Sequence, residues 1–190
     1  MKCCHCGASV QVTETSTAFC SAACENAYEF ITRSGLNEYY KADNFGVKPQ
    51  EFDDYNYEHF EKETVINLVS DKYIGIQKEI VFYIPQMRDQ QDVWLLSKLY
   101  NMNVGIGICV ADLKTKSLKV AFDSRLLTVK HVIETLNMIG FPPELEVKGE
   151  HFALGSDLKI ASWMCEKLRF KRLKSISKTA FKNLKVSLFL

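Results

Sequence analysis

Apolar and polar side chains between residues 64 and 147 alternate in the manner of β-strands at several places. Residues 79–85 (EIVFYIP) are rich in β-branched and aromatic side chains and end at a proline, which is typical of a strand. Residues 104–112 and 117–122 have the same character and flank a short polar turn, so they predict two paired strands. A short apolar run at 145–147 leaves room for a last strand.

Two segments between these strands have the spacing of helices. Residues 89–99 (DQQDVWLLSKL) predict a helix with Asp89 as its N-cap. Residues 128–139 repeat apolar side chains every three and four positions, which gives a helix one apolar face. Thr128 is the expected N-cap of this helix and Gly140 its stop. The order β-α-β-β-α-β is that of the ferredoxin-like fold, which we predict for this segment.

The apolar spacing changes on both sides of this segment, and we predict an α+β chain in four parts. They are a cysteine-rich metal-binding knuckle at 1–42, an acidic linker at 43–63, the ferredoxin-like domain at 64–147 and a basic helical tail at 148–190. The knuckle ends in a stretch with helical spacing at 22–40. Gly46 and Pro49 interrupt the linker, and the tail predicts helices at 157–170 and 172–190.

Composition and charge narrow the class of protein. With 47% hydrophobic and 25% charged residues, the chain is typical of a globular protein. No apolar run reaches the roughly 20 residues of a membrane helix, and no apolar stretch follows Met1, so we expect a cytoplasmic protein without a secretory signal. The net charge is +1, but acidic residues are in excess over 1–66 and basic residues over 148–190. A basic tail suits an anionic membrane surface or nucleic acid.

Four of the seven cysteines have the spacing of a metal-binding knuckle. The pattern is Cys3-x-x-Cys6 followed by Cys20-x-x-x-Cys24. Two thiolates on one tight turn can bind one ion, and a second pair at the start of a helix completes a tetrahedron. Thiolates are soft ligands, so we expect zinc or another soft ion such as copper or iron, and neither magnesium nor calcium. A site closed by four sulfurs is structural, and ion binding would stabilise a segment too short to have a core of its own.

The remaining cysteines and the nearby histidine leave alternatives. Cys4 and His5 lie inside the knuckle and either can replace a ligand, although adjacent cysteines rarely bind one ion together, which makes Cys4 the spare thiol. Cys109 and Cys165 are isolated and are expected to be small buried hydrophobes. The alternative to a metal site is a set of reduced thiols or two disulfides, which the ligand spacing disfavours.

Several strings resemble a known family. CHCG at 4–7, FCSAAC at 19–24 and GLNEYY at 35–40 resemble the cytoplasmic N-terminal region of copper-transporting P-type ATPases that load cytochrome oxidase during its assembly. The FCxxxC string with its helix is also similar to treble-clef zinc knuckles. VWLLSKL at 93–99 and IETLNMIGFPPEL at 133–145 are similar to the heavy-metal-associated domain that follows in those ATPases. The resemblance, which covers residues 3–145, implies a role in metal handling, with a transporter or a copper chaperone as partner.

The chain departs from this family at two points. The family has GMxCxxC on the loop before the first helix of its second domain, and here the string at 86–92 is QMRDQQD. Asp89 and Asp92 thus replace both cysteines, and hard carboxylates are poor ligands for Cu(I). We expect the two aspartates to cap the helix rather than to share a divalent ion, and copper relay by this domain to be lost. No segment resembles the phosphorylation motif, nucleotide domain or membrane helices of the pump, so the chain is a fragment or a stand-alone derivative.

No string of the chain predicts catalysis. The phosphate-loop, nucleophile-elbow and zinc-protease motifs are missing from the sequence, and we expect a protein that is not an enzyme. The main hypothesis is a metal-binding docking or regulatory part of a copper-export system. One alternative is an interaction module that binds a protein through the ferredoxin-like sheet. Another is a nucleic-acid-binding zinc protein that uses the knuckle and the basic tail, although the acidic first third disfavours nucleic acid as a partner.

Overall fold

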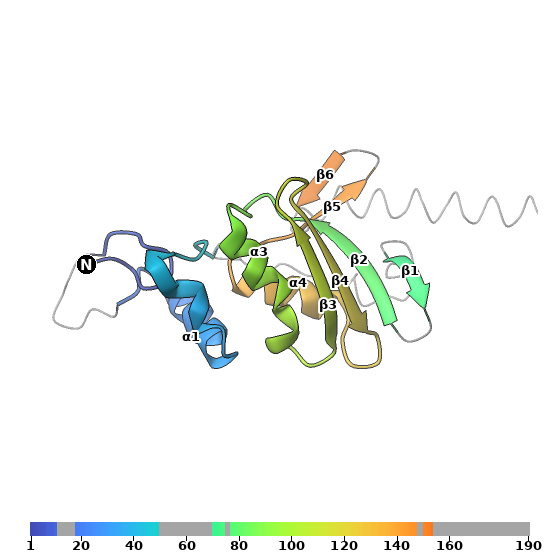
Figure 1. Ribbon diagram of the computed structural model, residues 1–190, viewed down its shortest axis with the longest axis horizontal. Coiled ribbons are helices and arrows are strands. Elements are labelled where there is room, and N and C mark those ends of the chain that lie inside the picture. The colour runs from blue at the N-terminus through green and yellow to red at the C-terminus, as the bar shows by residue number, and fades with distance from the viewer. Residues whose placement is uncertain (11–17, 50–69, 75–76, 148–149, 154–190) are drawn as a thin grey trace, which may run out of the picture. The chain divides into compact units, whose positions relative to one another are not determined.

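The computed structural model describes residues 1–10, 18–49, 70–74, 77–147 and 150–153 (Figure 1). The described residues all belong to one compact unit, Met1–Gly155. The helices predicted for the basic tail lie outside the described residues, and so does Cys165. Within the part of the chain that is described, no helix has the length and apolar character needed to cross a bilayer.

The unit Met1–Gly155 combines helices with one antiparallel sheet. Its helices are α1 (Ala22–Arg33), the 3₁₀ helix η1 (Asn37–Asp43), α3 (Gln90–Ser97), the 3₁₀ turn η3 (Leu99–Asn101) and α4 (Val129–Met138). Its strands are β1 (Ser70–Ile74), β2 (Gln77–Tyr83), β3 (Ile106–Asp112), β4 (Ser117–Asp123), β5 (Glu144–Val147) and β6 (Glu150–Ala153). The predicted succession β-α-β-β-α-β is present as β2-α3-β3-β4-α4-β5.

The strands lie in the order β3-β4-β2-β5-β6, and β1 pairs with β2 beside β5. Among the described residues, neighbouring strands all pair antiparallel, and β2 pairs with β4 along its whole length. The sequence pattern did not predict β1 or β6. The β6 strand extends the sheet to Ala153, six residues beyond the expected end of the domain at Val147.

The core lies between one face of the sheet and the helices α3 and α4 (Figure 1). Alternate residues of β2 and β4 are buried, as the period of two requires. The sheet side of this core consists of Ile80, Phe82, Leu118, Val120 and Phe122, and the helix side includes Leu95, Leu96, Val132, Ile133 and Leu136. Burying each such side chain contributes about 1.5–3 kcal/mol, which makes this core the main source of stability of the α+β segment.

Local signals set the ends of both long helices of this segment as predicted. The Asp89 carboxylate accepts hydrogen bonds from two N–H groups in the first turn of α3, at 2.9 and 3.1 Å. Thr128 caps α4, because its hydroxyl accepts from the N–H of His131 while the His131 ring accepts from the N–H of Thr128. Gly140, with φ +93°, follows the end of α4 in the left-handed conformation that glycine favours.

The first part of the chain departs from the expected helix at 22–40. Helix α1 ends at Arg33, and Gly35 at φ +76° turns the chain into η1. Residues 44–49, which have no regular secondary structure, follow η1. We call residues 36–49 the strap, because they contact both the knuckle and the helices of the α+β segment. The expected boundary between knuckle and linker at residue 42 falls inside the strap.

Candidate metal centre

The first cysteine pair lies on a tight turn closed by backbone hydrogen bonds. The N–H of Gly7 donates to the carbonyl of Cys3 at 3.0 Å, and the N–H of Cys3 donates to the carbonyl of Ala8 at 2.8 Å. Gly7 has φ +72°, and a Cβ there would lie 2.7 Å from the ring of Phe45. A glycine at this position is therefore required both by the backbone conformation and by the packing against the strap.

The second cysteine pair lies at the N-terminus of α1. Ser21 is the N-cap, and its hydroxyl accepts from the N–H of Cys24 at 3.3 Å. Cys20 therefore lies directly before the helix and Cys24 in its first turn. The free N–H groups and the dipole of a helix N-terminus favour negative thiolates at this place.

The structure brings the four predicted ligands together. The sulfur atoms of this cluster all lie within 4.8 Å of one another, and the cluster consists of Cys3, Cys6, Cys20 and Cys24. The Sγ atoms of Cys6 and Cys20 are 3.5 Å apart, and so are those of Cys20 and Cys24. Four thiolates around one zinc ion, each at about 2.3 Å from the metal, have sulfurs about 3.8 Å apart. The cluster thus has the size of a tetrahedral site for one ion.

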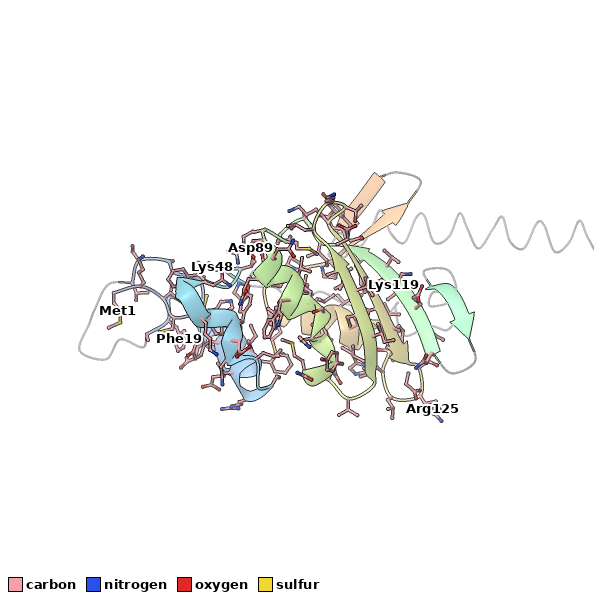
Figure 2. The ribbon with its side chains drawn as sticks, in the orientation of Figure 1. Met1, Phe19, Lys48, Asp89, Lys119 and Arg125 are labelled. Carbon is pink, nitrogen blue, oxygen red and sulfur yellow. The ribbon has the colours of Figure 1, made fainter. Side chains whose placement is uncertain are left out.

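The cluster is set into the protein and is not a surface patch of thiols. Cys3 and Cys24 are fully buried, whereas Cys6 and Cys20 are partly exposed. Figure 2 labels Met1 and Phe19 in the part of the molecule that contains the cluster. Each of the two segments thus contributes one buried and one partly exposed thiol to the cluster.

The surroundings change the acidity of the thiols in opposite directions. Burial raises the pKa of the Cys3 thiol, but hydrogen bonds from the backbone N–H groups of Cys6, Cys20 and His5 and from the Cys6 thiol outweigh it and bring the pKa to about 7. Burial is also the main cause that raises the pKa of Cys6 and of Cys24. Of these three thiols Cys3 thus ionises most easily, and a dication at the centre would stabilise the thiolate form of the cluster.

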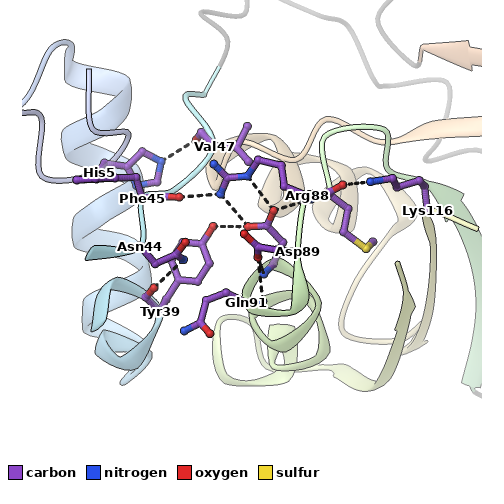
Figure 3. Close-up of polar contacts among 11 residues, drawn as sticks. His5, Tyr39, Asn44, Phe45, Val47, Arg88, Asp89, Gln91 and Lys116 are labelled. Carbon is purple, nitrogen blue, oxygen red and sulfur yellow. Dashed lines mark hydrogen bonds and ion pairs between the residues drawn. The ribbon is translucent and has the colours of Figure 1, made fainter. Parts of the chain in front are cut away.

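Neither alternative ligand of the knuckle joins the cluster. Cys4 is exposed. His5 is fully buried, and both of its ring nitrogens have other partners. Nδ1 lies 2.7 Å from the Tyr40 hydroxyl. Nε2 lies 2.8 Å from the Val47 carbonyl (Figure 3). Because a carbonyl can only accept, Nε2 carries the proton and Nδ1 accepts from Tyr40. His5 therefore supports the knuckle from the strap instead of binding an ion.

The two aspartates at the start of α3, Asp89 and Asp92, have different roles. Asp89 is the helix cap, as predicted. Asp92 is the acidic residue in the first turn of α3, as expected for a carboxylate that favours the helix dipole, but this is not its whole role. Its carboxylate is fully buried and accepts from Tyr39 Oη at 2.7 Å and from Arg88 Nε and Nη2 at 3.0 Å (Figure 3). The N–H of Arg88 donates to the same carboxylate at 2.8 Å. With both oxygens occupied, Asp92 is not a ligand for a shared divalent ion.

Charge and burial keep the side chains of Arg88 and Tyr39 protonated. The Asp92 carboxylate raises the pKa of the Arg88 guanidinium above its ordinary value. Burial, followed by the charge of Asp92, raises the pKa of the Tyr39 hydroxyl, so Tyr39 stays a donor. Arg88 Nη2 also donates to the carbonyl of Phe45 at 2.6 Å, and Lys116 Nζ donates to the carbonyl of Met87 on the same loop.

Sequence reasoning missed His5, Tyr39, Tyr40 and Arg88 as organising residues. His5 and Tyr40, which contact each other, are 35 positions apart in the sequence, and Tyr39 is 53 positions from its partner Asp92. No local periodicity could have indicated such distant contacts. The only available signal was the string GLNEYY, which contains both tyrosines. Cys109 was predicted correctly as a buried residue, and burial raises the pKa of its thiol to about 12.

The sequence matches no protein-family model and no curated protein. Among solved structures, the crystal structure of oxidized MerP from Ralstonia metallidurans CH34 is similar to part of the chain. The two are 15% identical, the match covers 37% of this chain and 99% of MerP, and the TM-score is 0.35. A likeness at this level establishes neither the fold nor the function of the chain.

Proposed function

We propose that this chain is a metal-binding protein without catalytic activity and that its cysteine cluster binds one soft ion, zinc in the first place and copper in the second. The ligands would be Cys3, Cys6, Cys20 and Cys24. The observation that carries the proposal is the gathering of four sulfurs within 4.8 Å of one another from two separate segments. Four thiolates fill the tetrahedral coordination sphere of zinc and leave no position for a substrate, which supports a structural role.

Ion binding would stabilise the folded state of the knuckle. The apolar side chains of α1 that are fully buried are few, chiefly Ala27 and Ile31 beside the cysteines. So small a core does not order a segment of this length by itself, and a four-sulfur site supplies folding free energy directly. The ion would therefore fix the turn of Cys3 and Cys6 against the start of α1.

We infer a ferredoxin-like fold of the heavy-metal-associated type for the α+β segment and a treble-clef-like fold for the knuckle. The element order β-α-β-β-α-β and the strand order support the first, and the resemblance of 19–24 and 35–40 supports the second. The loop at 86–92 has no thiolate, and Asp92 is bound to Arg88 and Tyr39. This segment would thus serve in docking or regulation and not in Cu(I) transfer.

The cellular role that we propose is that of a cytoplasmic part of a copper-export system, either as a region of a P-type ATPase or as a stand-alone derivative. The resemblance over residues 3–145 supports it. A transporter or a copper chaperone would be the partner, with residues 148–190 at the membrane surface. Sequencing of the transcript beyond both ends of this chain would test the ATPase parentage, because a pump requires membrane helices and a phosphorylation motif.

Metal content tests the proposed function. We expect the purified full chain to contain about one equivalent of zinc, because one tetrahedral site is present. Elemental analysis combined with thiol titration of the native protein would measure it. Cys24→Ser should lower the zinc content strongly, whereas Cys109→Ser, a matched change of a buried cysteine outside the cluster, should not. Seven free thiols in a folded, zinc-free wild-type protein would contradict the proposal.

A further inference from the structure

The strap, residues 36–49, contacts the metal-binding knuckle and the loop before α3 with neighbouring side chains. Tyr40 Oη donates to His5 inside the knuckle. The adjacent Tyr39 Oη donates to Asp92 of α3 (Figure 3). The two rings are also in edge contact, with centroids 5.2 Å apart. Adjacent residues of one short helix thus connect the cysteine turn to the position where the resembling family has its metal-binding loop.

The rest of the strap repeats this double attachment. On the knuckle side, the N–H of Gly46 donates to the carbonyl of His5 at 2.6 Å, and His5 Nε2 donates to the carbonyl of Val47. On the other side, Arg88 Nη2 donates to the carbonyl of Phe45. The backbone of Phe45 thus contacts the α+β segment, and the backbone of the next two residues, Gly46 and Val47, contacts the knuckle.

Close packing leaves the strap little freedom to move while both contacts persist. A Cβ at Gly46 would overlap the imidazole of His5, and a Cβ at Gly140, directly after α4, would overlap the carbonyl of Val47. Interfaces packed as tightly as this have discrete arrangements and do not deform gradually. Movement of His5 would thus displace the strap as a whole.

We propose that ion binding at the cysteine cluster holds the strap against the loop at 86–92, and that loss of the ion releases it; this inference rests on the proposed function. His5 lies between Cys4 and the ligand Cys6, so the turn that an ion would fix is the turn that positions the imidazole. Without the ion this turn loses its folding free energy, and His5 no longer holds Tyr40 and Val47 in place.

Release of the strap would change the surface beside α3. Tyr39 of the strap and Asp92 of α3 are both fully buried where they meet, and Arg88 is half-exposed. Without the strap, the carboxylate of Asp92 and the guanidinium of Arg88 lose Tyr39 and the Phe45 carbonyl as partners and face solvent. The occupancy of the cysteine cluster would thus decide whether this charged loop is covered or available to a partner.

Thermodynamic linkage between ion binding and the position of the strap can be tested at Tyr39, which contacts α3 and not the cysteine cluster. If the ion stabilises the strap, weakening the strap must weaken ion binding by the same free energy. We expect Tyr39→Phe, which removes one hydroxyl from the Asp92 contact and no ligand, to lower the zinc affinity of the full chain about fivefold or more. Tyr100→Phe, the same change at an exposed tyrosine, should leave the affinity unchanged. Competition with a coloured chelator measures both.

Footprinting of the unmutated chain makes the test independent of how the variant folds. Hydroxyl-radical labelling of Tyr39 should be low with zinc and should rise after chelation, while the exposed Tyr100 serves as the internal reference. Equal labelling of Tyr39 in both states, or an unchanged zinc affinity of Tyr39→Phe, would overturn this inference and leave the proposed function standing. A wild-type chain that takes up no zinc would overturn both.

Discussion

Tyr39 and Asp92 lie 53 positions apart in the sequence, and their side chains form a hydrogen bond of 2.7 Å in the buried interior of the protein. The Asp92 carboxylate binds a hydroxyl and a guanidinium. It thus supplies an acceptor that joins the segment after the knuckle to the α+β segment.

Removing the charge of Asp92 should destabilise the protein. In Asp92→Asn the shape is kept, but Arg88 loses its ion pair and the buried amide must find partners for its N–H groups. Because Arg88 is half-exposed, water replaces part of the lost contact, and we expect a loss of about 2 kcal/mol. Urea unfolding of the zinc-loaded chain would measure it.

Asp112→Asn, at the exposed end of β3, is the matched control for this change. Asp112 accepts only from the N–H of Lys114 among the described residues, and asparagine can accept in the same way. We expect an effect within about 0.5 kcal/mol. Equal unfolding midpoints for the two variants would contradict the importance of the Asp92 contact.

Alanine variants of two glycines with positive φ, Gly35 and Gly140, distinguish the cost of backbone strain from the cost of disturbing the packing of the strap. Gly35→Ala meets no atom within 4 Å, so only the left-handed conformation opposes it, at about 1 kcal/mol. Gly140→Ala meets the same strain and in addition the carbonyl of Val47, so it should destabilise by about 2 kcal/mol or more. Unfolding midpoints of the two variants give the difference. A Gly140→Ala protein as stable as Gly35→Ala would show that Val47 does not pack there.

The cysteines should differ sharply in reactivity toward an alkylating reagent. Cys4 is exposed and lies outside the cluster, so we expect it to react first among the described cysteines. Cys109 is buried with its pKa raised to about 12, which leaves almost no thiolate at neutral pH. It should react only after unfolding. Peptide mapping by mass spectrometry after brief alkylation would check both, and early labelling of Cys109 would contradict its place in the core.

Local signals predicted the parts of the fold that depend on neighbouring residues. The alternation in 79–85 and 117–122, the caps at Asp89 and Thr128, and the stop at Gly140 each act within a few positions and appear in the structure with small shifts of boundary. The spacing of the cysteines likewise indicated which four thiols come together, because a turn and a helix start determine the geometry of each pair.

The strap could not be predicted in this way. Residues 37–40 have helical spacing, but Gly35 ends the helix and tertiary contacts select a 3₁₀ helix instead. Asp92 at the start of a helix is consistent with a cap by every local rule, and only the approach of Tyr39 from a distant part of the chain makes it a buried ion-pair partner. A single sequence contains no record of such pairings.

The central claim, one ion bound by four cysteine sulfurs, is tested most directly by X-ray absorption at the zinc edge of the purified full chain. The claim predicts a first shell of four sulfur atoms at about 2.3 Å and no nitrogen or oxygen ligand. Loss of one sulfur from this shell in Cys6→Ser, with the shell intact in Cys4→Ser, would identify the ligand set. A shell that contains an imidazole nitrogen, or that loses a sulfur in Cys4→Ser and not in Cys6→Ser, would contradict the claim.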